Sequence, residues 1–174
     1  MGQTLKKQEE AIVNALQSDN DQTVIETVEK IREKGSAALI PFLIDLLIST
    51  KSGEIQQAVE RLFSELREQA CVAPIMEALQ SKSTEGYKHI LVSVFWQSAL
   101  DGSEYFENFV KLAIEEDYLT CIECLSVLEN IDFEINEDQL VNAIADINSE
   151  LHKTTDKTPL LVDLATMLQN KMIG

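Results

Sequence analysis

Glycine, proline and aromatic residues are scarce in this chain of 174 residues, which holds six glycines, three prolines and 6% aromatic residues. An all-β protein needs many tight turns, and glycine and proline are the residues that form them, so the composition argues against that class. The chain is 45% hydrophobic, mostly Leu, Ile, Val and Ala, which suits helices packed on helices. We therefore expect a buried helical core and no extended disorder.

Basic residues are also scarce, because 14 Lys and Arg stand against 30 Asp and Glu, and the net charge is −16. The imbalance is concentrated in residues 101–150, which hold fourteen acidic residues and a single base, Lys111. So acidic a chain repels phosphate backbones and anionic lipids, and we expect no nucleic-acid or membrane binding. A basic protein or peptide partner is compatible with this charge, although a merely solvated acidic face is the simpler interpretation.

Long apolar runs are missing, and the longest one, 37–44, is far too short to span a bilayer. The first residues lack the apolar core of a secretory signal. Three cysteines, an odd number without such a signal, are typical of reduced thiols. We therefore expect a cytoplasmic location.

Motifs that carry chemistry are missing as well: there is no phosphate-binding glycine loop, nucleophile elbow, zinc-protease helix or EF-hand loop. Cys121-Ile122-Glu123-Cys124 is a lone Cys-x-x-Cys, and too few other Cys and His residues exist to complete a zinc site. Both cysteines fall on the apolar face of a helical pattern, so we interpret them as buried small hydrophobic residues. We predict no catalytic residue, no metal and no cofactor.

What the sequence does contain is an internal repeat. The heptapeptide IVNALQS at 12–18 returns as IMEALQS at 75–81, and 44–49 has the same apolar pattern. Anchors taken from each repeat are Leu16, Leu47, Leu79, Ala113 and Ile144, with steps of 31, 32, 34 and 31 residues. A recurrence of this length predicts stacked two-helix units.

Apolar spacing at three and four residues predicts two helices in each repeat. The first helices are expected over 5–18, 36–50, 70–81, 103–115 and 136–151, and the second over 21–34, 53–68, 84–100, 117–131 and 158–172. Residues suited to cap these helices stand before them: Asp21, Ser36, Ser52, Ser83, Ser103, Asp117 and Asn136. The polar stretch 149–158 is longer than the other breaks, which is typical of a mobile loop or an atypical terminal cap.

Pro41 and Pro74 lie in the first helices of repeats two and three. A proline within 39–47, followed by an amphipathic partner helix, resembles the HEAT-like repeat family. The resemblance implies an all-α fold, namely an α-solenoid of about five two-helix repeats forming one domain over 1–174. In that family the second helices usually line the concave side, where partners bind. The resemblance indicates architecture and says nothing about activity.

Alignment of the second helices on their core residues Val28, Val59, Leu91 and Leu125 defines a solvent-side column of Glu26, Gln57, His89 and Glu123. A further column on the same face holds Glu33, Ser64, Trp96 and Asn130. Three polar members predict that Trp96, the only tryptophan, is exposed. We therefore predict a partner-binding surface of Trp96, His89 and Ser93, flanked by Gln57 and Glu123. The alternatives are that Trp96 covers the seam to the fourth repeat, or that the register slips by one residue.

The function that these observations favour is a non-enzymatic binding or scaffold module that acts on a protein or peptide through its concave face. Two alternatives stay open. One is an enzyme or enzyme-accessory protein of the HEAT-like lyase or hydroxylase kind. The other is an acidic mimic of nucleic acid that blocks a basic protein.

Overall fold

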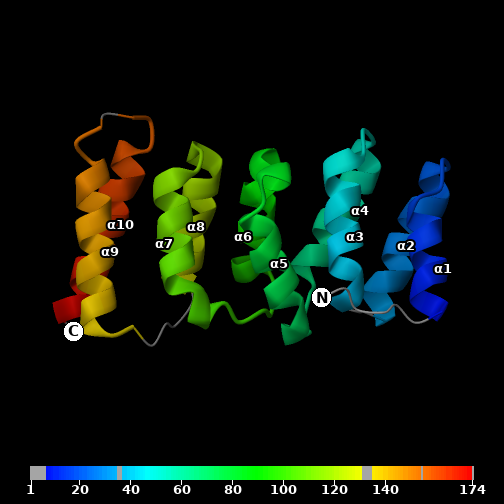
Figure 1. Ribbon diagram of the computed structural model, residues 1–174, viewed down its shortest axis with the longest axis horizontal. Coiled ribbons are helices and arrows are strands. Elements are labelled where there is room, and N and C mark those ends of the chain that lie inside the picture. Colours follow the sequence, from blue (N-terminus) through cyan, green and yellow to red (C-terminus); the bar gives the residue numbers. More distant parts are fainter. Residues whose placement is uncertain (1–6, 35–36, 131–134, 154, 174) are drawn as a thin grey trace. The chain divides into compact units, whose positions relative to one another are not determined.

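The fold is helical throughout the residues that the computed structural model describes, which are 7–34, 37–130, 135–153 and 155–173 (Figure 1). As the sequence predicts, every regular element within these ranges is a helix and none is a strand. The α-helices are α1 Lys7–Leu16, α2 Asp21–Lys34, α3 Ile40–Ser49, α4 Gly53–Ser64, α5 Val72–Leu79, α6 Lys88–Gln97, α7 Phe106–Glu115, α8 Tyr118–Asn130, α9 Glu137–Glu150 and α10 Thr158–Ile173. Among the described helices, none combines the length and the apolar character needed to cross a membrane.

The helices group into two compact units, residues 1–100 and residues 101–174. The sequence predicts one domain over 1–174, and that prediction stays a prediction. Within each unit, consecutive helices pair as the repeat predicts, and each pair is visible as two adjoining coils in Figure 1.

In the first unit α1 packs on α2, α3 on α4 and α5 on α6. The first helices of these hairpins also contact one another, α1 with α3 and α3 with α5, and the second helices do the same, α2 with α4 and α4 with α6. This pattern forms two layers of helices around one core. The repeat anchors Leu16, Leu47 and Leu79 are all buried in that core, which explains their recurrence.

The second unit has the same pattern, with α7 on α8, α9 on α10, α7 on α9 and α8 on α10. Its anchor Ala113 is buried. The fifth anchor, Ile144, is only half-buried, whereas its neighbour Ala143 is buried. The core register of α9 therefore lies one residue before the predicted anchor.

The predicted helix caps are confirmed before α8 and α9, displaced by one residue at α2 and without a side-chain hydrogen bond at α4. Asn136 forms a full capping box with Gln139 at the start of α9, and the Thr120 N–H donates to Asp117 Oδ1 at 2.8 Å. At α2 the cap is Asn20 and not Asp21, because the Thr23 N–H donates to Asn20 Oδ1 at 3.0 Å. Ser52 occupies the N-cap position of α4, but its side chain accepts no capping hydrogen bond. Ser36 lies outside the described residues.

Lys157, in the segment between α9 and α10, is buried although this segment looks solvated in the sequence. Its ammonium group donates to the carbonyl oxygens of Ala113 at 3.2 Å and Ile114 at 2.7 Å, and also to that of Glu116. A cation at these carbonyls meets both the unpaired acceptors and the negative end of the α7 dipole. Lys157 therefore ties the start of α10 to the end of α7.

Candidate functional site

Only some of the α6 residues predicted to bind a partner are accessible to solvent. Trp96 is 41% exposed, as the prediction requires. His89 is half-buried, and its Nδ1 is buried without a hydrogen-bond partner among the described residues. Ser93 is only 9% exposed, and its hydroxyl donates to the Ile90 carbonyl at 2.8 Å. Trp96 is thus the accessible group of the three, and Ser93 lies beneath the surface.

The two flanking residues do not belong to one unit. Gln57 is exposed on α4 in the first unit, whereas Glu123 is half-buried on α8 in the second. The alignment also slips in α8, because Cys124 is fully buried and Leu125 only half-buried. The core register of α8 is therefore one residue earlier than the sequence alignment assumes. That any of these residues binds a partner stays a prediction.

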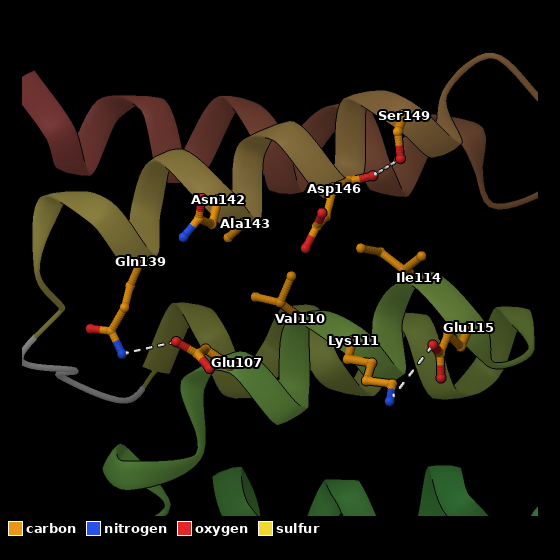
Figure 2. A pocket seen from close by; sticks show the side chains of 10 residues that line it. All are labelled: Glu107, Val110, Lys111, Ile114, Glu115, Gln139, Asn142, Ala143, Asp146 and Ser149. Atoms are coloured by element: carbon orange, nitrogen blue, oxygen red, sulfur yellow. Dashed lines mark hydrogen bonds and ion pairs between the residues drawn. The ribbon is translucent and has the colours of Figure 1, made fainter.

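A groove of about 520 Å³ lies between α7 and α9 in the second unit, and we call it the α7–α9 groove. Figure 2 shows side chains from both helices turned toward it. Its lining residues are Glu107, Val110, Lys111, Ile114 and Glu115 from α7, and Gln139, Asn142, Ala143, Asp146 and Ser149 from α9. Val110 and Ala143 are buried, whereas the carboxylates are exposed. The groove therefore has an apolar base and an acidic edge.

Two of the three carboxylates in the α7–α9 groove have partners inside it. The Gln139 side-chain amide donates to Glu107 Oε1 at 3.2 Å and so bridges the two helices. Glu115 lies 3.9 Å from the Lys111 ammonium, one turn away on α7. The carboxylate of Asp146 has neither an ion pair nor a hydrogen bond with another described residue, and it points into the groove near Val110 (Figure 2). Asp146 is therefore the acidic group most available to a ligand.

A smaller groove of about 290 Å³ lies between α3 and α5 in the first unit, and we call it the α3–α5 groove. Its lining residues are Pro41, Ile44, Asp45 and Ile48 from α3, Pro74, Glu77 and Ala78 from α5, and Ser81, Ser83 and Thr84 from the following turn. It too has an apolar base and carboxylates at its edge.

The lining residues of the two grooves are separated by constant distances in the sequence. Pro41, Ile44, Asp45 and Ile48 lie 66 residues before Glu107, Val110, Lys111 and Ile114. On the opposite wall, Pro74, Glu77, Ala78 and Ser81 lie 65 residues before Gln139, Asn142, Ala143 and Asp146. Neither groove was identified from the sequence. The lining residues lie at constant distances in the sequence from the anchor residues. These distances are a signal for both grooves, because they mark where the first helices of neighbouring hairpins meet.

The cysteines offer no reactive thiol. Cys71, Cys121 and Cys124 are free and buried, which confirms the prediction that Cys121 and Cys124 are core residues. Burial raises the pKa of the Cys71 and Cys121 thiols to about 11 and that of Cys124 well above its ordinary value. A thiol acts as a nucleophile or metal ligand only as the thiolate, which burial disfavours here. No group of three or more His, Cys, Asp or Glu able to hold a metal ion occurs within the described ranges.

In comparisons with protein-family models, with curated proteins and with solved structures, nothing matches this chain.

Proposed function

We propose that the protein is a non-enzymatic binding or scaffold module that binds basic side chains of a protein or peptide in its α7–α9 groove, in the cytoplasm. The observation that carries the proposal is the groove itself. It combines a buried apolar base, Val110 and Ala143, with an exposed carboxylate, Asp146, that no described residue neutralises.

We further propose that the hairpins stack as a HEAT-like α-solenoid of about five repeats. The support comes from inside each unit, where first helices contact first helices and second helices contact second helices. That contact pattern is the one by which repeats of this kind bury a continuous core. Small-angle X-ray scattering tests the arrangement, since an elongated particle is expected and a compact sphere would refute it.

The chemistry of the α7–α9 groove favours lysine or arginine in a partner. Both residues have long aliphatic stems that can lie on Val110 and Ile114 while the charged head remains near water. The head then meets Asp146 and the acidic segment around it, where Lys111 is the only base between residues 101 and 150. Attraction between opposite charges on two partners raises the association rate and orients the partner more than it raises affinity.

A defined peptide tests this proposal directly. The probe is a fluorescein-labelled peptide of alternating Lys and Ala, about ten residues long so that it spans the groove when extended. We expect its fluorescence anisotropy to rise with the protein, and the rise to vanish near 0.5 M NaCl, where charges are screened within about 4 Å. A matched peptide of Glu and Ala should not bind.

Two substitutions locate the binding. Asp146→Asn should weaken binding of the Lys peptide about threefold to fivefold, because one partly exposed ion pair contributes up to about 1 kcal/mol. Asp163→Asn, at an exposed carboxylate on α10 outside the groove, serves as the control and should change little. If both variants weaken binding equally, the peptide responds only to net charge, and the proposal for the α7–α9 groove is wrong.

Trp96 provides a second candidate contact, because a tryptophan with 41% of its surface exposed is a typical binding hot spot. Because Trp96 is the only tryptophan in the chain, the tryptophan fluorescence of the protein comes from this residue alone. Binding at α6 should shield its fluorescence from acrylamide and should be lost in Trp96→Ala. A partner whose binding leaves the quenching unchanged does not use this residue.

A further inference from the structure

We infer that the α3–α5 groove is a second binding site on the same chain, which takes a single lysine or arginine side chain of a partner. The inference rests on the proposed function but concerns a different unit. It starts from the equivalence of the two grooves, whose lining positions differ by a constant 66 residues on one wall and 65 on the other. Each unit therefore has a groove at corresponding positions of two neighbouring first helices.

The walls of the α3–α5 groove are apolar and stiff. Ile44 is buried, Ile48 and Pro74 are half-buried, and Pro41 stands in the first turn of α3. Proline holds its backbone angle and has no freely rotating side chain, so these walls lose little entropy when a ligand enters. The aliphatic stem of lysine or arginine fits such a surface.

The charge at the edge of this groove comes from both helices. Asp45 belongs to α3 and Glu77 to α5, and both side chains are exposed. Neither carboxylate forms an ion pair or a side-chain hydrogen bond with another described residue. No base is among the residues that line the groove, so a cation entering it would meet two carboxylate acceptors.

One end of the groove is held in place by hydroxyl groups. Thr84 is buried, and its hydroxyl lies 2.6 Å from the Ala78 carbonyl and 2.9 Å from that of Ser81. The Ser81 hydroxyl in turn accepts from the Ser83 N–H at 3.2 Å. The first two bonds satisfy the Ala78 carbonyl near the end of α5 and the Ser81 carbonyl just beyond it. The turn is therefore already ordered before a ligand arrives.

The grooves differ at one equivalent position in a way that predicts different selectivity. Asp45 in the first unit corresponds to Lys111 in the second, which lies near Glu115. A basic ligand at the α7–α9 groove must share its carboxylates with Lys111, whereas no base is among the residues that line the α3–α5 groove. Asp45→Lys should therefore make the α3–α5 groove resemble the α7–α9 groove at this position and weaken its binding of a cation.

Site-resolved NMR on the full-length chain tests the inference. The probes are blocked tripeptides, acetyl-Ala-Lys-Ala-amide and its Arg counterpart, which are too short to crosslink distant sites, with the Glu tripeptide as control. In ¹H–¹⁵N spectra we expect amide shifts in α3 and α5 as well as in α7 and α9.

Asp45→Asn with Glu77→Gln should remove the shifts in α3 and α5 alone, and Asp146→Asn should weaken those in α7 and α9 alone. Glu54→Gln, at an exposed carboxylate in the first turn of α4, is the matched control.

Each outcome decides between the two claims. Two independent clusters of shifts support the inference if the Asp45 and Glu77 substitutions remove only the cluster in α3 and α5 and Asp146→Asn weakens only the cluster in α7 and α9. Shifts confined to α7 and α9 overturn it while leaving the proposed function intact. Shifts that spread over all acidic surfaces and ignore the Asp45 and Glu77 substitutions show nonspecific charge attraction, which overturns the inference. An absence of shifts in both grooves overturns both claims.

Discussion

The two units have the same helix pairing but differ in their balance of acidic and basic residues. The first unit carries ten bases and fourteen acids, and ion pairs join neighbouring hairpins: Arg32 lies 3.4 Å from Glu65, and Arg61 lies 3.7 Å from Glu29. The second unit has four bases against sixteen acids. Its described Lys–Glu ion pairs join residues three or four apart, within a helix or at its end. Packing of apolar residues inside each unit therefore sets the pairing of its helices, while charge distinguishes the two units.

The single interaction that most distinguishes the second unit is the buried ammonium of Lys157. We expect Lys157→Met to lower the free energy of unfolding by about 3 kcal/mol, because three carbonyls at the end of α7 lose a charged donor. The nearest counterpart in the first unit is Gln69, whose amide donates to the Ala99 carbonyl at 3.0 Å. Gln69→Ala should lower the same free energy by only about 1 kcal/mol.

Urea unfolding monitored by circular dichroism measures both changes. Lys153→Met serves as the control, because Lys153 is an exposed neighbour in the same segment and its ion pair with Glu150 contributes little. If Lys157→Met is no more destabilising than Lys153→Met, the bonds to α7 contribute nothing to stability.

Alkaline pH should weaken the second unit more than the first. Burial raises the pKa of Cys71 in the first unit, and of Cys121 and Cys124 in the second, above the ordinary value of 9.0. Below about pH 9 each thiol is protonated in both states, and its contribution to stability is complete. As the pH rises from about 9 toward 11, the unfolded chain ionises first. Stability should therefore fall by up to about 1.4 kcal/mol per pH unit for each thiol.

Urea unfolding at about pH 8 and about pH 10 tests this dependence. Cys121→Ala with Cys124→Ala should flatten the decline more than Cys71→Ala does. A decline that is unchanged in the double variant would assign the alkaline sensitivity to other groups.

Helix capping should differ between the units as well. Asn136 caps α9 with a complete capping box, so Asn136→Ala should lower the free energy of unfolding by about 1 kcal/mol. Ser52 stands at the N-cap of α4 without a side-chain hydrogen bond, and Ser52→Ala should change it by only a few tenths of a kcal/mol. Equal losses in thermal unfolding would show that Ser52 caps α4 in solution.

The smallest expected effect is that of salt. Added NaCl should slow hydrogen exchange in α7–α10 more than in α1–α6, because screening relieves the repulsion among sixteen acids in the second unit. In the first unit, screening also weakens the favourable pairs of Arg32 and Arg61. Mass spectrometry of exchanged peptides resolves the two units. A uniform response would mean that the difference in net charge has no energetic consequence.

Much of the helical organisation could be predicted from the sequence, because it depends on the local spacing of apolar residues. The anchors Leu16, Leu47, Leu79 and Ala113 are buried for that reason. The prediction slipped by one residue at Leu125 and Ile144, where a small neighbour, Cys124 or Ala143, is buried instead. Small side chains allow closer helix packing, and a hydropathy pattern alone cannot show which of two adjacent apolar residues faces the core.

The grooves and the buried lysine were harder to predict because both depend on contacts between hairpins. Asp146 and Glu107 look like solvated acidic residues until α7 and α9 are placed side by side. Lys157 lies in a polar stretch that resembles a loop, and its carbonyl partners are more than forty residues away. Charge patterning along the chain does not reveal such distant pairings.

The burial of Lys157 also makes it a chemical reporter of motion. Its amine is occupied by three carbonyls, so an amine-reactive reagent should acylate it more slowly than the exposed Lys153 and Lys171. Modification at Lys157 then requires the start of α10 to detach from α7, and the acylation rate measures how often this opening occurs. One native lysine thus reports local opening of the second unit without any substitution.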